Sequence, residues 1–356
     1  KLQLKDFQGA IDDYQKAIEL DPDCLTAQRN YAIAKKKLIN GDSPTKIELT
    51  KFDKSFINPL TKFNSLKYFY NGKRKLENGD YKGAEVDLTE FIYLEKNNED
   101  AYLLRAYAKF NLGDFAEAID DCDQGISIDP NKANFYALKS SSLVSLEKYE
   151  NALKNINKAI ELEDDESSHY EIRASIEFEL GNYEIALKSI NKGIDIDDTD
   201  LDLYQLKASI ESELGYYEKV VLTSSEAISK GLENSVIFYL RAESRYFQED
   251  YENALKDINQ SIELESSEED SDLEDDYTLF LRARIKNSLE NYNSALNDLS
   301  AINNGSLVKS SEFLTERGIS NVYLGNNDEG FKDLEEAVKL GDEYAQEVIK
   351  NLFENN

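Results

Sequence analysis

The sequence has few of the residues on which most catalytic, metal and disulfide sites depend. Its 356 residues include one His, two Cys and no Met. A single histidine, His169, makes no metal-ligand cluster and lies beside no evident nucleophile, and no phosphate-cradling glycine loop occurs. Two cysteines, Cys24 and Cys122, do not form a disulfide framework. We therefore expect no catalytic residue, no metal site and no cofactor, and we interpret His169 as a solvated residue at a helix start.

Long apolar stretches are also missing. No run of 18 apolar residues occurs, so we expect no membrane span. The chain opens at Lys1 inside what would be a first helix, and we expect it to be truncated there, which leaves an upstream targeting segment open. Composition names no compartment, and a cytoplasmic location is the one we favour.

Basic residues are in deficit. There are 41 Lys and Arg against 71 Asp and Glu, a net charge of −30, which argues against nucleic acid or an anionic membrane as the main partner. The balance is uneven, because residues 35–75 hold 11 basic and 3 acidic residues. The clusters 35–37 and 73–75 are either a docking patch for something acidic, including another copy of the chain, or solvated helix faces, which we prefer. Self-association stays open.

One aromatic position recurs at a fixed interval. Successive members are 34 residues apart, and we call them anchors: Tyr81, Phe115, Tyr149, Tyr183, Tyr217 and Tyr251. The series continues at Tyr292 and at Asn327, where Asn replaces the aromatic. Such a period is the signature of a repeat architecture, in which each unit buries its apolar face on its neighbour.

Residues 99–132 show what one unit contains. Gly113 permits a tight turn, Phe115 and Ala118 begin a new apolar stripe, and Pro130 cannot continue a helix. The unit is therefore predicted to be helix, turn, antiparallel helix, turn. Small residues stand where two helices must approach closely, at Gly72, Ala106, Ser140, Ala174, Ala208, Ala242, Ala283 and Gly318, and again at Ala84, Ala118, Ala152, Ala186, Val220, Ala254, Ala295 and Gly330.

This pattern resembles the tetratricopeptide repeat (TPR) family, over nearly the whole chain. The resemblance implies an all-α fold, a right-handed superhelical solenoid of antiparallel helix pairs with a C-terminal capping helix. We expect a single domain over 1–356: a truncated repeat at 1–22, a divergent repeat with an irregular basic segment at 25–64, eight repeats at 65–344 and a capping helix at 345–356. Cys122 falls where other repeats carry Leu or Ile, so we expect it to be buried.

A basic residue precedes the anchor by ten positions in seven consecutive repeats, and a row of cations could follow a polyanion. However, the repeats with Arg105, Arg241, Arg282 and Arg317 carry Asp121, Asp257, Asp298 and Asp333 six residues after their anchors. We infer Arg–Asp pairs between the two helices of a repeat, worth about 1 kcal/mol or less if exposed.

The resemblance places the partner surface on the first helix of each repeat. Residues there form three zones. They are an apolar and aromatic zone (Phe69, Tyr70, Leu103, Tyr107 and Phe110), a small polar and acidic zone (Ser141, Glu171, Ser175, Glu179, Gln205, Ser209 and Glu213) and a second aromatic zone (Tyr239, Tyr246, Phe247, Tyr277 and Phe280). The candidate partner-binding residues are Phe69, Tyr70, Leu103, Tyr107, Phe110, Glu171, Glu179, Gln205, Tyr239, Tyr246, Phe247, Tyr277 and Phe280.

These residues favour a non-catalytic protein-interaction scaffold that binds an extended or helical segment with apolar anchors and a basic centre. The alternatives are an enzyme or accessory subunit with an acidic groove site, and a scaffold that assembles with itself through its basic N-terminal and acidic C-terminal regions. Some TPR proteins hold the C-terminal carboxylate of Hsp70 or Hsp90 with a Lys clamp. No complete repeat here has Lys twelve residues before its anchor, so we expect no such clamp.

Overall fold

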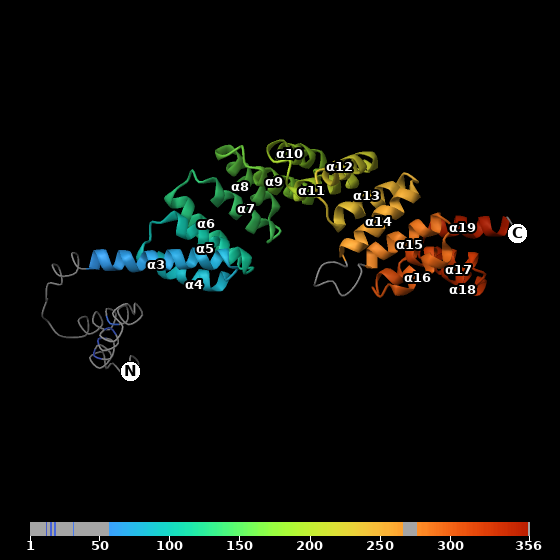
Figure 1. Ribbon diagram of the computed structural model, residues 1–356, viewed down its shortest axis with the longest axis horizontal. Coiled ribbons are helices and arrows are strands. Elements are labelled where there is room, and N and C mark those ends of the chain that lie inside the picture. The colour runs from blue at the N-terminus through green and yellow to red at the C-terminus, as the bar shows by residue number, and fades with distance from the viewer. Residues whose placement is uncertain are drawn as a thin grey trace. The chain divides into compact units, whose positions relative to one another are not determined.

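The computed structural model describes residues 57–265 and 276–354, together with four single residues before 57. Seventeen α-helices and one short 3-10 helix, η2 (Leu307–Lys309), make up these residues, without a strand (Figure 1). The truncated repeat, most of the divergent repeat, Cys24, the cluster 35–37 and the acidic stretch 266–275 lie outside the described residues.

Eight antiparallel helix pairs follow one another along the described chain. The first helices are α3 (Ile57–Glu77), α5 (Glu99–Asn111), α7 (Ala133–Val144), α9 (Ser167–Glu179), α11 (Leu201–Glu213), α13 (Ser235–Phe247), α15 (Asp276–Ser288) and α17 (Ser311–Tyr323). The second helices are α4 (Tyr81–Leu94), α6 (Phe115–Ile128), α8 (Tyr149–Leu162), α10 (Tyr183–Ile196), α12 (Tyr217–Ser229), α14 (Tyr251–Glu265), α16 (Tyr292–Ala301) and α18 (Asn327–Lys339). Every anchor is the first residue of a second helix.

The turn inside each pair needs a residue in the left-handed region. Gly113 fills it with φ 81°, as the sequence predicts. Three other turns place Glu147, Glu249 and Glu290 there, with φ of 56°, 61° and 59°. A side chain in this region is strained, so these turns depend on the packing of the helices on either side.

The small residues lie where the two helices of a pair touch, as predicted. A Cβ added to Gly72 would stand 2.7 Å from Cγ of Leu88. One added to Gly318 would meet Leu334 Cγ at 2.8 Å and the carbonyl oxygen of Gly330 at 3.0 Å. The Ala residues at the equivalent positions are fully buried, so the helix contact is as close as an Ala side chain allows.

The contacts of the chain divide it into two compact units, 1–130 and 131–356. In the second unit, the packing continues from one repeat to the next: Ala174 and Ile190 of the α9–α10 pair share an apolar cluster with Leu203 and Ile210 of α11. The α9–α10 pair thus buries its apolar face on the pair that follows it. A single solenoid over the whole chain stays a prediction.

The last pair is covered by α19 (Glu343–Glu354). Ala345 is fully buried with Leu334 and Ala337 of α18, and Val348 and Ile349 pack against the same cluster. Helix α19 therefore gives the end of the second unit an apolar covering.

Three local expectations can be compared with the structure. Helix α3 begins at Ile57, earlier than the expected repeat start at residue 65, and Pro59 lies in its first turn, where proline is tolerated. His169 is not solvated: it is 3% exposed, and its Nδ1 lies 3.1 Å from the carbonyl oxygen of Glu163. Cys122 is buried, as expected. Within 57–265 and 276–354, no helix is long and apolar enough to cross a membrane.

Candidate functional site

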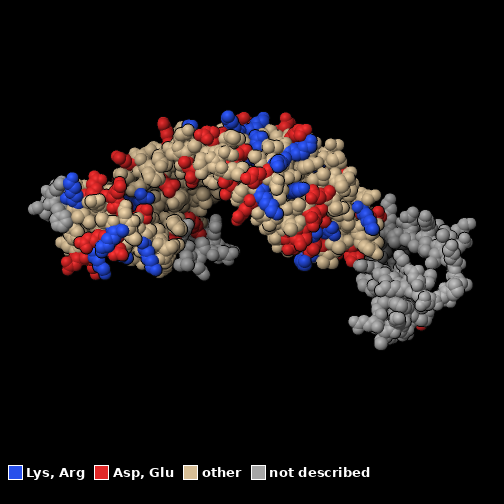
Figure 2. Space-filling model, turned by 180° about the vertical axis from the view of Figure 1, so that it is seen from behind, with Lys and Arg blue, Asp and Glu red and all other residues tan. Residues whose placement is uncertain are grey.

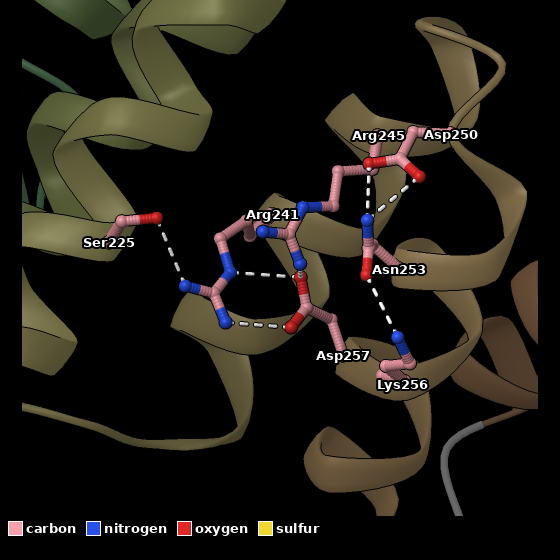
Figure 3. Close-up of polar contacts among 7 residues, drawn as sticks. All are labelled: Ser225, Arg241, Arg245, Asp250, Asn253, Lys256 and Asp257. Atoms are coloured by element: carbon pink, nitrogen blue, oxygen red, sulfur yellow. Dashed lines mark hydrogen bonds and ion pairs between the residues drawn. The ribbon is translucent and has the colours of Figure 1, made fainter.

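The predicted Arg–Asp pairs join the two helices of a repeat. In the α13–α14 pair, Nε and Nη2 of Arg241 donate to the two carboxylate oxygens of Asp257 at 2.8 and 2.7 Å (Figure 3). The pairs of Arg105 with Asp121, Arg282 with Asp298 and Arg317 with Asp333 have the same bidentate geometry, with donor–acceptor distances of 2.6–2.9 Å. The inferred intra-repeat pairing is confirmed.

The pairs have further polar contacts around them. Asp257 also accepts a hydrogen bond from the guanidinium of Arg245, which lies on the same helix as Arg241 (Figure 3). The remaining Nη1 of Arg241 donates at 3.0 Å to Oγ of Ser225 in α12, the preceding repeat (Figure 3). Arg105 reaches Thr89 of α4 in the same way, at 3.1 Å. The arginine therefore connects three helices rather than two.

The energetic expectation for these pairs needs correction, because the carboxylates are not exposed. The Asp257 side chain is 5% exposed, and that of Asp121 is 4% exposed. Loss of one partner from a buried pair costs about 3–5 kcal/mol, since it leaves a charge without compensation. These cations stabilise the repeats, and they do not form a free track for a polyanion.

Elsewhere, acidic and basic side chains are mixed over the molecular surface, as the face in Figure 2 shows. In the basic cluster 73–75, Lys73 and Arg74 are exposed, whereas Nζ of Lys75 pairs with Asp87 at 2.8 Å. Lys75 thus takes the role that Arg has in later repeats. Among the described residues, no group of three or more His, Cys, Asp and Glu could hold a metal ion.

A hollow of about 430 Å³ lies on three consecutive first helices of the second unit. We call it the first-helix hollow. Its walls combine three carboxylates with apolar and small polar side chains, and its lining contains no Lys or Arg: Ser175, Phe178, Glu179, Leu206, Ser209, Ser212, Glu213, Leu240 and Glu243. Four of these, Ser175, Glu179, Ser209 and Glu213, belong to the predicted polar and acidic zone.

Carboxylates on these helices are partly withdrawn from water. Burial raises the pKa of Glu243, an effect that the nearby charge of Arg284 and a hydrogen bond from Tyr239 oppose. Burial also raises the pKa of Glu171, and the negative charges of Asp200 and Asp202 add to the shift. Both shifts mean that this surface holds negative charge at a cost, which a bound cation would reduce.

Gln205 is turned partly toward the protein, since its Oε1 accepts a hydrogen bond of 2.9 Å from the side-chain amide of Asn234. Glu179 is exposed and Glu171 is half-buried. The acidic candidates therefore differ in how much of the side chain a partner could reach, and Glu179 is the most open.

The aromatic candidates of the first unit fall into two groups. Tyr70 and Tyr107 are 64% and 46% exposed. Phe69 and Phe110 are half-buried, packed on Phe91 and Phe115 at ring-centroid distances of 5.1 and 5.5 Å, and Leu103 is half-buried too. The tyrosines are the accessible members, while both phenylalanines also hold their repeats together.

The same division holds in the second unit. Phe247 and Tyr277 are 47% and 52% exposed, and the ring of Phe247 stacks on Tyr217 at 4.6 Å. Tyr239 and Tyr246 pack against the apolar cluster of α13–α15, and Phe280 packs against that of α15–α17. These three have a structural role whatever else they bind.

Sequence reasoning missed four residues that line the first-helix hollow. Leu206 and Leu240 stand eleven residues before their anchors, and Phe178 and Ser212 five before theirs. Glu243 was not missed in this way, because it shares with Ser175 and Ser209 an offset that sequence reasoning places on the first-helix surface. Tracking more offsets along the repeats would have found the other four, because equivalent positions of successive repeats fall on one surface.

Two family profiles match parts of the chain. One, described as a tetratricopeptide repeat, matches residues 1–24. The other, described as subunit 3 of the anaphase-promoting complex, or cyclosome, matches residues 77–159. No curated protein matches the chain significantly.

Solved structures resemble it in fold. A tetratricopeptide repeat protein from Parabacteroides merdae has a TM-score of 0.52 at 17% identity, over 72% of this chain and 98% of that one. The APC/C hetero-tetramer Cut9-Hcn1 also gives 0.52, at 13% identity, over 91% of this chain and 59% of its own. PilF of Pseudomonas aeruginosa gives 0.51 at 16% identity, over 58% of this chain and 95% of that one.

The 34-residue period, the antiparallel pairs and these likenesses agree with one another. The chain is a tetratricopeptide repeat protein with an all-α fold.

Proposed function

We propose that the chain is a protein-interaction scaffold that binds an extended or helical protein segment on its first helices. Proteins of this repeat family are generally non-catalytic scaffolds. The observation that carries the proposal is the first-helix hollow, in which Glu179, Glu213 and Glu243 share a lining with Phe178 and Leu206 and with no Lys or Arg.

The lining sets the chemistry of the partner. Apolar side chains favour an apolar group, whose burial contributes about 25 cal/mol per Å². Three carboxylates in one hollow favour a Lys or Arg beside that group, since an opposite charge stabilises the ionised form. A segment with a basic residue next to an apolar one satisfies both features.

Exposed aromatic rings on the first helices are further candidate contacts within each unit. Phe247 and Tyr277 lie on α13 and α15 of the second unit, and Tyr70 and Tyr107 lie on first helices of the first unit. Tyrosine supplies contact area at low entropy cost and is enriched among residues that dominate binding energy. We infer that these four rings, rather than Phe69, Phe110 or Phe280, are the aromatic residues that contact a partner.

A second candidate, an enzyme or accessory subunit with an acidic site, has less support. Glu171 and Glu179 lie on one helix, and the described residues contain no group of His, Cys, Asp and Glu that could hold a metal ion. The family description that matches residues 77–159 names a subunit of a large complex, which fits a scaffold better than it fits a hydrolase.

The proposal is tested by selection from a display library of random 15-residue peptides on the wild-type chain. We expect the selected peptides to carry Lys or Arg next to Leu, Phe or Ile, and to be displaced as the salt concentration rises. Selection of acidic peptides, or of none above background, would count against a basic and apolar partner.

A further inference from the structure

A second hollow, of about 240 Å³, lies at the far end of the second unit and is lined differently. We call it the tyrosine hollow. It is formed by α13, α15, the start of α16, α17 and α19, and its most distinctive lining is four tyrosines and two glutamates: Tyr246, Tyr292, Tyr323, Tyr344, Glu316 and Glu347.

The rings are arranged around the hollow with their faces partly available. Tyr292 and Tyr323 stack in parallel, with centroids 4.5 Å apart and planes inclined by 3°. Tyr323 and Tyr344 are each 56% exposed. The face of an aromatic ring carries negative electrostatic potential, so several rings around one space attract a cation, and most strongly where water is partly excluded.

A buried carboxylate reinforces that attraction. Glu316 is 7% exposed, and its Oε2 accepts a hydrogen bond of 2.8 Å from the side-chain amide of Asn287. Oγ of Ser320 donates to Oδ1 of the same amide at 2.7 Å, which fixes its orientation. Glu316 is therefore held in one position in the lining, at the desolvation cost that a buried carboxylate carries.

The nearest internal cation only partly compensates this charge. Nε of Arg284 lies 3.7 Å from Oε1 of Glu316, longer than a charged hydrogen bond. The same guanidinium lies over the ring of Tyr246 at 4.7 Å and over that of Phe280 at 5.9 Å. The protein thus already places one cation on this aromatic group, and Glu347 leaves the lining with more negative than positive charge.

The ionisation of Tyr344 reports the same potential. Its pKa is raised to about 12, first by burial and then by the carboxylate of Glu316, the hydroxyls of Tyr246 and Tyr251, and the carboxylate of Glu347. Burial penalises a charge of either sign, whereas the carboxylates of Glu316 and Glu347 oppose a further negative charge and favour a positive one.

We propose that the tyrosine hollow binds an alkylammonium group, such as the side chain of a lysine or a methylated lysine. The rings take the ammonium head by cation–π contact, and Glu316 and Glu347 supply the opposite charge. The site does not rest on the proposed use of the first-helix hollow, because it shares no lining residue with that hollow.

The test measures the binding of three small probes to the full chain by ligand-observed NMR titration. They are N-acetyl-lysine methylamide, its trimethyl-lysine counterpart, and the neutral tert-butyl analogue in which carbon replaces the trimethylated nitrogen. We expect at least one charged probe to bind at least tenfold more tightly than the neutral one. Equal binding of the neutral analogue, or no binding of either charged probe at millimolar concentration, overturns the proposal.

Variants locate the binding and separate it from folding. Tyr323→Ala should weaken the charged probe tenfold or more, while Tyr323→Phe, which keeps the ring, should stay within about threefold of wild type. Tyr93→Ala removes a tyrosine of similar exposure, 52%, on α4 and should change nothing. If Tyr323→Ala binds like wild type, or if Tyr323→Phe loses binding equally, the rings are not the site. If the probes do not bind at the tyrosine hollow, the proposal for the first-helix hollow is unaffected, because peptide binding there is tested separately.

Discussion

Acidic side chains have opposite surroundings in two regions of the second unit. In the seam between α13 and α14, Asp257 meets the guanidiniums of Arg241 and Arg245. In the first-helix hollow, Glu179, Glu213 and Glu243 line a space whose walls contain no Lys or Arg. The ion pairs between α13 and α14 stabilise the fold. In the hollow, burial raises the pKa of Glu243, so that carboxylate is charged at a cost to the fold, which is the pattern expected where a surface serves a partner.

The largest expected effect is the loss of a seam cation. Arg241→Ala should lower the free energy of unfolding by about 3 kcal/mol, because it leaves Asp257 buried with only Arg245. The control is Lys207→Ala, at the same offset in a repeat where Thr223 replaces Asp; it should cost less than about 1 kcal/mol. Urea unfolding midpoints measure both.

The double variant Arg241→Ala with Asp257→Ala sharpens this test. It should be no less stable than Arg241→Ala alone, because it also removes the buried carboxylate that Arg245 only partly compensates. A double variant clearly less stable than the single would mean that the seam pair is not the source of the effect.

Close contact between α17 and α18 gives the next effect. Gly318→Ala should cost about 1–3 kcal/mol, since its Cβ would stand 2.8 Å from Leu334 and 3.0 Å from the backbone of Gly330. Gly305→Ala, where a Cβ meets nothing within 4 Å, should be close to neutral. Thermal unfolding of the two variants compares them, and equal losses would show that the contact is looser than the structure has it.

A buried acid whose pKa is raised should lower stability at neutral pH, even with lysines nearby. Burial raises the pKa of Glu211, although the hydroxyl of Thr223 donates to its Oε2 at 2.7 Å. A raised folded-state pKa means that stability from the protonated form is present at low pH and is lost as pH rises. Glu211→Gln should therefore raise Tm at pH 7.5, on the order of 2 °C.

The pH dependence checks the cause of that gain. The difference between Glu211→Gln and wild type should shrink as the pH falls through the raised pKa of Glu211, where the wild-type carboxyl takes up a proton. A difference that is constant with pH would indicate a packing effect instead.

Much of the fold was predictable because the repeat fixes it locally. The anchors Tyr81 and Tyr251 begin second helices, and the Arg–Asp pairs follow from two offsets on facing helices. The left-handed turns at Glu147 and Glu249 were not predictable, since tertiary packing overrides the usual preference for glycine there. His169 was misread because helix-start position says little about burial.

A site could be predicted from the sequence only where its lining residues recur at the same position of successive repeats. Glu179 and Glu213 stand at one offset and both line the first-helix hollow. The tyrosine hollow gave no such signal, because Tyr344 belongs to α19, which is outside the repeats, and Tyr323 has Glu179 and Glu213 at its offset in earlier repeats. Only the fold brings these residues to one place.

The most direct measurement compares two charge-matched triple variants against a peptide selected on the wild-type chain. One changes Glu179, Glu213 and Glu243 of the hollow to Gln; the other changes Glu184, Glu218 and Glu252, exposed in the first turns of α10, α12 and α14. Isothermal titration at a fixed salt concentration gives both affinities. The account predicts at least a tenfold loss in the first variant and less than twofold in the second. Equal affinities in the two variants would contradict it.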